Sequence, residues 1–146
     1  MMPGVTSRWL VSLTAVVAVL GATTGRGAQP PADPHVLLGT WRGTSVCTDR
    51  VAAPACNDED VIYEFKPGAT PDGVHWVADK IVKGVREPMG ELDLAFDAVE
   101  ACWKGAYTGP RVTVVWRLSV DGTTMTGSAR LMPGNQTVRK VNLRKD

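Results

Sequence analysis

The chain has few of the residues on which most catalytic sites depend. Its only two histidines are His35, in a Pro-rich segment, and His75, in a predicted strand, so neither a metal triad nor a Ser-His-Asp set can be assembled. Residues 43–47 resemble a nucleophile elbow only up to their fifth position, and they lie in a predicted strand rather than at a strand-to-helix turn. We therefore expect no catalytic residue, no metal and no cofactor, and predict that the protein is not an enzyme.

Long apolar runs are also absent, apart from residues 9–20, which follow Arg8 and precede the small residues of 21–28. This order is typical of a secretory signal peptide, and the run is shorter than the ~20 residues that cross a bilayer. No Cys directly follows it, which disfavours a lipid anchor. We predict a signal peptide over residues 1–28, no stable membrane insertion, and a secreted or periplasmic protein. The cleavage point stays open among three small residues, Gly25, Gly27 and Ala28.

An excess of charge of either sign is absent as well. The formal net charge is +1, which argues against nucleic acid or an anionic membrane as a partner. The chain is long enough for one domain and too short for two once the signal peptide is removed. We predict a Pro-rich leader over residues 29–35 and a single domain over 36–146. The basic residues of 139–146 alternate with Val141 and Leu143, which favours the solvated face of a strand.

Cysteine is scarce, with Cys47, Cys56 and Cys102 in the predicted domain. Export implies oxidising conditions, and a Cys47–Cys56 disulfide is the natural pairing, which would contribute about 2 to 3 kcal/mol by closing a short loop. Cys102 is left over, and we expect a buried thiol that packs as a small hydrophobe rather than a nucleophile. The acidic residues of 57–60 lack the spacing and glycine of a calcium loop, so we expect a solvated loop beside the disulfide.

The rest of the sequence alternates with the period of a strand rather than that of a helix. Turn dipeptides such as Asp121-Gly122 separate the alternating segments, and Asp121-Gly122 is the clearest hairpin signal. The boundary between the fourth and fifth segments is the weakest, because residues 97–101 could instead form one helical turn. The eight predicted strands are 40–47, 61–65, 74–82, 89–96, 100–107, 111–120, 125–132 and 137–144.

Each predicted strand has one apolar face, as in Val112, Val114 and Trp116 of the sixth. Eight antiparallel strands joined in order remove their free edges by closing on themselves. We predict an all-β fold, a single eight-stranded antiparallel up-and-down barrel with meander topology. A barrel of about this size is either filled by its own side chains or holds one small ligand.

Gly39-Thr40-Trp41, at the start of the first predicted strand, resembles the G-x-W signature of lipocalins and the wider calycin group. With the preceding signal peptide and the Cys pair, the chain looks most like small exported lipocalin-like proteins of bacteria with no assigned activity. The resemblance implies a barrel over residues 36–144 whose base is closed by Trp41 against a basic residue of the last strand. Neither the third-strand motif of typical lipocalins nor their C-terminal helix is visible.

Two arginines compete for the place beside Trp41. If the last strand lies antiparallel beside the first, its end faces the start of the first, which favours Arg144. Side-chain parity favours Arg139 instead, because Arg139 shares a face with Val141 and Leu143. Arg139 lies about 16 Å further along the strand, so a bulge near Arg144 is the smaller adjustment. We predict a barrel-base signature of Gly39, Trp41 and Arg144.

Aromatic residues are few, and most of them fall on the predicted inward faces. Several Trp residues in one barrel suggest an avidin-like ligand cage, but large inward residues that simply fill a small barrel are the stronger interpretation. His75 could bind haem, as in barrels of the nitrobindin kind, yet the chain has no His near its C-terminus, and we expect His75 to face solvent. The candidate ligand-binding residues are Trp76, Trp103, Trp116, Tyr63, Phe65 and Tyr107.

Two functional classes follow from these patterns. We predict an exported binding protein that holds a small apolar or amphipathic ligand inside the barrel. The alternative is an interaction or inhibitor protein whose barrel is filled and whose loops bind a partner protein or envelope component. An interior cavity of roughly 300 Å³ or more would favour the first class, because ligand pockets begin at about that volume.

Overall fold

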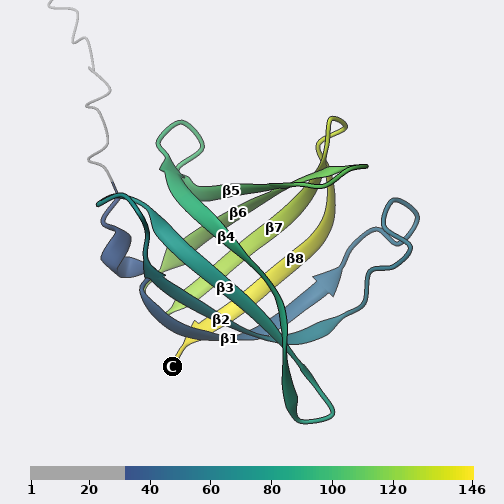
Figure 1. Ribbon diagram of the computed structural model, residues 1–146, viewed down its shortest axis with the longest axis horizontal. Helices are drawn as coiled ribbons and strands as arrows, with labels where there is room; N and C mark the ends of the chain where they lie inside the picture. The colour runs from purple at the N-terminus through teal and green to yellow at the C-terminus, as the bar shows by residue number, and fades with distance from the viewer. Residues whose placement is uncertain (1–31) are drawn as a thin grey trace, which may run out of the picture.

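Eight strands account for most of residues 32–146, which are the part of the chain that the computed structural model describes (Figure 1). A 3-10 turn, η1 (Pro34–Val36), precedes them. The predicted signal peptide and residues 29–31 of the predicted leader lie outside the described residues. Among residues 32–146, no helix is long and apolar enough to cross a membrane. The strands are β1 (Gly39–Cys47), β2 (Glu59–Pro67), β3 (Val74–Val82), β4 (Val85–Asp97), β5 (Cys102–Thr108), β6 (Thr113–Asp121), β7 (Thr124–Met132) and β8 (Gln136–Lys145).

Every strand pairs antiparallel with the next, and β8 returns to pair with β1, which closes the barrel. The predicted all-β, eight-stranded antiparallel up-and-down barrel is therefore confirmed. The closing seam requires a glycine at Gly43 of β1, where a Cβ atom would lie 2.0 Å from the backbone oxygen of Asn142 in β8. Any larger residue would push the first and last strands apart.

The third predicted strand matches β3, whereas β4 begins at Val85 rather than at residue 89. Lys83 and Gly84 join β3 to β4, with φ angles of 49° and 79°. Positive φ at both central residues is the geometry of a type I′ turn, whose twist matches that of the paired strands. Lysine is uncommon at the first central residue of such a turn. A single glycine at position 84 was therefore not enough to predict the turn from the sequence. The predicted Asp121-Gly122 hairpin is confirmed, with Asp121 paired to Thr124.

Residues 98–101 form a turn rather than a helix, and β5 begins at Cys102 rather than at residue 100. The Asp97 carboxylate accepts hydrogen bonds from the backbone N–H groups of Val99 and Glu100, each at 2.9 Å. An Asp side chain that binds the following backbone in this way favours a turn over a helix. Ala101 completes the reversal with a φ of 52°.

The two ends of the barrel differ. The base is filled: η1 lies across it in Figure 1, and Leu37 and Trp41 there are fully buried. The described part of the predicted leader belongs to this end, because Ala32 packs against the core. The other end, the mouth, carries the β1–β2, β3–β4, β5–β6 and β7–β8 connections (Figure 1). Most of the large buried side chains lie toward the base, which leaves room inside the mouth.

Candidate functional site

A cavity of about 470 Å³ occupies the mouth half of the barrel. One wall is aromatic and apolar, and one end is polar. Strand alternation explains the aromatic wall, because every second side chain of a strand points inward. The residues that line the cavity are Ser45, Glu59, Tyr63, Trp76, Ala78, Met89, Gly90, Glu91, Leu92, Tyr107, Trp116 and Arg139.

The aromatic wall is a packed cluster rather than a set of isolated rings. The ring of Trp76 meets that of Tyr63 edge-on at 4.7 Å between centroids, and that of Trp116 at 5.1 Å. Offset and edge-on aromatic pairs of this kind are favourable beyond their burial and hold one another in place. The cavity is therefore bounded by rings with restricted orientations.

Four of the six aromatic residues predicted for the interior line the cavity: Tyr63, Trp76, Tyr107 and Trp116. The other two are inward but outside the cavity lining. Phe65 stacks against Trp76 with 6.0 Å between centroids, and Trp103 packs edge-on against Phe96 at 5.4 Å. Both are 2% exposed. Phe65 and Trp103 therefore fill the base half of the barrel, and Phe65 supports the aromatic wall through its contact with Trp76.

The polar end of the cavity is built around Arg139 of β8. Its Nη1 donates to the Ser45 Oγ at 2.8 Å and to a carboxylate oxygen of Glu59 at 3.1 Å. Burial raises the pKa of Tyr63 to about 12, opposed only in part by its hydrogen bond with Ser45, so this phenol stays neutral. The interior thus contains an ion pair, a hydroxyl and a phenol beside the aromatic wall.

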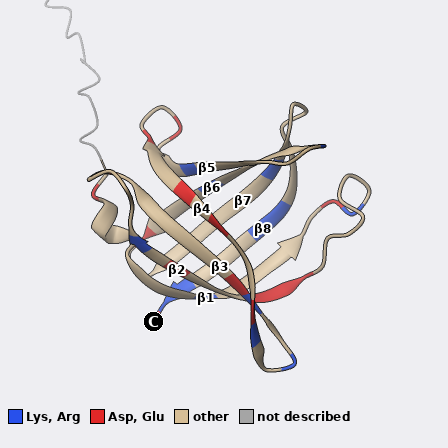
Figure 2. Ribbon diagram, viewed as in Figure 1, with Lys and Arg blue, Asp and Glu red and all other residues tan. Residues whose placement is uncertain are grey.

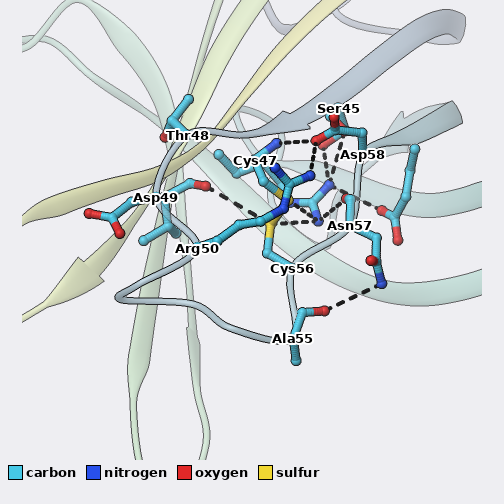
Figure 3. Close-up of a disulfide and its surroundings, with 12 residues drawn as sticks. Ser45, Cys47, Thr48, Asp49, Arg50, Ala55, Cys56, Asn57 and Asp58 are labelled. Carbon is cyan, nitrogen blue, oxygen red and sulfur yellow. Dashed lines mark hydrogen bonds and ion pairs between the residues drawn. A yellow bond between two sulfur atoms is a disulfide. The ribbon is translucent and has the colours of Figure 1, made fainter.

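Arg139 also ties to the barrel the disulfide loop, whose Cys47 and Cys56 are shown in Figure 3. The predicted Cys47–Cys56 disulfide is confirmed, and Cys47 is the register partner of Arg139 in the β1–β8 pair. The Nη2 of Arg139 donates to the backbone oxygen of Asn57 at 2.8 Å and contacts the Cys56 Sγ at 3.2 Å. Arg139 and Val141 are two residues apart in one strand, so the sequence predicted that they share a face. The contacts of Arg139 with residues 45–59 could not be predicted, because these residues are far from Arg139 in the sequence.

The acidic segment 57–60 serves the same loop. Asp58 accepts a hydrogen bond from the Cys47 backbone N–H at 2.8 Å and another from Arg50 at 3.1 Å. These bonds, first that from the Cys47 backbone, lower the pKa of Asp58. Within residues 32–146, no group of three or more His, Cys, Asp or Glu side chains is placed to hold a metal ion.

At the base, the residue beside Trp41 is Lys145, and the prediction of Arg144 was wrong. The Lys145 Nζ lies 5.4 Å from the centroid of the Trp41 ring, within the ~6 Å range of a cation–π interaction. Trp41 and Lys145 are register partners, whereas Arg144 is exposed on the outer face and Arg139 is in the mouth. β8 ends one residue later than predicted, at Lys145. Lys145 lies opposite Trp41 and is two residues from Leu143, so it shares the inward face without a bulge.

One side of the barrel wall is open near the mouth. β4 and β5 pair at the base end through residues 95–97 and 102–104. Toward the mouth, residues 85–94 of β4 pair only with β3, and residues 105–108 of β5 only with β6, so far as the described chain shows. Met89 and Tyr107, at this separation, line the cavity and are 39% and 58% exposed. Toward the mouth the two strands diverge in Figure 1.

His75 and Cys102 lie outside the cavity. His75 is on the outer face of β3, where its ring contacts Asp93 at 2.8 Å and Glu91 at 3.2 Å, so the expectation that it faces outward is met. Cys102 is a buried free cysteine, as predicted, and burial raises the pKa of its thiol. The sequence matches no protein-family model, and no curated protein matches it.

Proposed function

We propose that this protein binds one small apolar or amphipathic molecule inside its barrel. The observation that carries the proposal is the cavity of about 470 Å³ in the mouth, which exceeds the ~300 Å³ at which ligand pockets begin. A barrel filled by its own side chains would have favoured the interaction or inhibitor class instead. The closed eight-stranded barrel with Trp41 buried at its base is consistent with a lipocalin-like fold, and we propose that relationship too.

The charges around the cavity also limit the chemical class of ligand that it can hold. Arg139 directs Nη1 and Nη2 at protein acceptors and is paired with Glu59, so its charge is already compensated. A ligand carboxylate would have to break these bonds, and burying an unpaired charge is costly. The geometry therefore suits a ligand with an apolar or aromatic body against Trp76 and Trp116 and a neutral polar group near Ser45.

We also propose that the protein is exported. The disulfide of Cys47 and Cys56 supports this, because disulfides persist in oxidising compartments. Secreted or periplasmic protein purified from its source should have this bond formed.

A fluorescence titration tests ligand binding. We expect tryptophan emission to change saturably, at about one ligand per chain, with long-chain alcohols or retinoid-like probes, and less with the matching carboxylates. Trp76→Phe and Trp116→Phe should remove most of the signal, because these indoles line the cavity. Trp103→Phe is the matched control and should retain it, because Trp103 lies outside the lining.

A second pair of variants separates cavity binding from adhesion to the surface. Ala78→Phe places a ring in the cavity and should abolish the saturable change. Ala106→Phe adds the same ring at an exposed position of β5 and should leave binding intact. Equal binding by both folded variants, or no saturable change across the whole panel, would overturn the proposal and favour the interaction class.

A further inference from the structure

A second hollow lies on the outside of the barrel, across β5, β6, β7 and β8. It has a volume of about 710 Å³ and contains three cationic side chains, Arg117, Arg130 and Lys140, with Ser128 among them. We call it the Arg–Lys groove. The groove and the interior cavity share no lining residue, because alternate side chains of each strand point to opposite faces.

The strand register arranges the three cations around Ser128. Arg117 pairs with Ser128 across β6 and β7, and Ser128 pairs with Lys140 across β7 and β8. Neighbouring strands lie about 4.8 Å apart, so the Cα atoms of Arg117 and Lys140 are about 10 Å apart. Arg130 follows on the same face of β7, about 7 Å from Ser128. The three cations therefore surround one small hydroxyl residue.

Two guanidinium groups in this groove have N–H groups that the described protein does not satisfy. Arg117 donates through Nε to Glu100 at 2.5 Å, and Arg130 donates through Nη1 to Asn135 at 3.4 Å. The Nη1 of Arg117 and the Nε of Arg130 are buried, yet neither has an acceptor among residues 32–146. A buried charged donor without a partner is costly. Both arginines line the groove, so an anion held there would lie beside their guanidinium groups.

The charge balance of the groove points to an anion. Glu100 is its one acidic lining residue, and it is already shared between Arg117 and Lys104. In the described chain, neither Arg130 nor Lys140 forms an ion pair. Figure 2 shows basic residues along β8, and Lys140 of this strand lines the groove.

We propose that the Arg–Lys groove binds a phosphate or sulfate group. Guanidinium groups donate two parallel N–H bonds to such oxyanions, and a lysine adds a mobile point charge. Arg130 and Lys140 supply the uncompensated charge, and Ser128 supplies a hydroxyl between them. The spacing of the cations suits a ligand with two adjacent anionic groups. This site is independent of the ligand proposed for the barrel interior.

Calorimetric titration with inorganic pyrophosphate at low salt tests the proposal. We expect saturable binding at one site per chain that weakens as salt is added. Lys140→Gln and Arg130→Gln should each weaken binding by about tenfold, the loss expected for one charge-assisted hydrogen bond. Arg144→Gln is the matched control, because it removes the same charge from an exposed position of β8 outside the groove lining. It should change the affinity by less than about twofold.

Further titrations identify the source of the anion. Inorganic sulfate tests the soluble ion, and vesicles of phosphatidylglycerol against phosphatidylcholine test a lipid headgroup. Binding by either route that Lys140→Gln weakens and Arg144→Gln spares supports the site. The proposal is overturned if no probe binds saturably, or if the two β8 variants lose affinity equally, because net charge alone would then explain the effect. Near-ultraviolet circular dichroism confirms that each variant is folded.

Discussion

At the scale of single residues, Trp41 is held at the base of the barrel by contacts with two other segments. Its ring is fully buried, its Nε1 donates to the Leu37 backbone oxygen at 2.8 Å, and Lys145 covers one face. The hydrogen bond links β1 to the segment that follows η1, and the cation links β1 to β8. One side chain therefore joins the cap, the first strand and the last strand.

Trp41→Ala should lower the free energy of unfolding by about 3 to 5 kcal/mol, the usual cost of truncating a buried aromatic residue. Lys145→Met keeps the apolar stem and removes the charge, and should cost about 0.5 to 1 kcal/mol. Urea unfolding provides the measurement. Because Trp41→Ala leaves little margin for folding, Trp41→Leu serves for the double-mutant cycle.

In that cycle the effect of Lys145→Met should be smaller when the Trp41 ring is absent, because only the bond from the Lys145 Nζ to the Val36 backbone oxygen at 3.4 Å is then lost. Arg144→Met is the control and should be additive with Trp41→Leu within about 0.3 kcal/mol, because Arg144 faces outward. Coupling of Trp41 to Arg144 instead of Lys145 would contradict the geometry at the base.

His75 makes stability depend on pH. The hydrogen bond to Asp93, and a second to Glu91, raise the pKa of His75 above its ordinary 6.5, while desolvation opposes them. The contribution of His75 to stability is thus fully present below pH ~6.5 and is lost as the pH rises through the raised pKa. Unfolding free energies of the wild type and His75→Gln should differ most below pH ~6.5 and converge as the pH rises above the raised pKa of His75. A difference that grows with pH would exclude this role.

At the scale of elements, the 48–58 connection is held to the mouth by two devices. The disulfide closes it onto the end of β1, and Arg139 binds it from β8 through Asn57 and Cys56. The same guanidinium pairs with Glu59 in the cavity. A change in the conformation of this loop would therefore move Arg139 and alter the polar end of the cavity.

Arg139→Lys should destabilise the protein by about 1 to 3 kcal/mol, because one ammonium group cannot replace a planar fork that binds several acceptors. Arg50→Lys offers a matched control in the same loop, where the side chain is 57% exposed and paired with Asp58 alone. It should change stability by less than about 0.5 kcal/mol. Chemical unfolding of both variants measures the difference, and equal losses would show that Arg139 does not anchor the loop.

At the scale of the whole molecule, the barrel is closed at its base and divided near its mouth. Residues 95–97 join β4 to β5, and the two strands then separate toward the mouth. The cavity lies behind this separation, with Met89 and Tyr107 at its edge. The part of the wall with the fewest strand-to-strand hydrogen bonds thus borders the cavity.

Hydrogen exchange should detect the division. Amides on the free edge of β4 within residues 85–94 should exchange faster than those of β1 and β2, which are paired on both sides. Exchange measured by NMR or mass spectrometry tests this, with β7 as a second doubly paired reference. Uniform protection of β4 and β7 would indicate that the wall is closed in solution. A ligand in the cavity should slow exchange in β4 and leave β7 unchanged.

The sequence alone determined the number of strands, their order and the disulfide. Alternation with period two and turn residues are local properties, and a short loop between Cys47 and Cys56 needs no other partner to be recognised. The predicted strand boundaries were wrong at two places. At Asp97 the side chain binds the following backbone and forms a turn, and at Lys83 a residue that is unusual in turns has a positive φ.

Contacts between distant segments were decided only by the tertiary structure. Lys145 reaches Trp41, and Arg139 reaches Glu59 and the disulfide loop, because the barrel closes between β1 and β8 with one particular register. A shift of that register by one residue would turn each of these side chains to the opposite face. The room left for a cavity depends in the same way on how inward side chains from eight strands fill a shared volume, and no single strand contains that information.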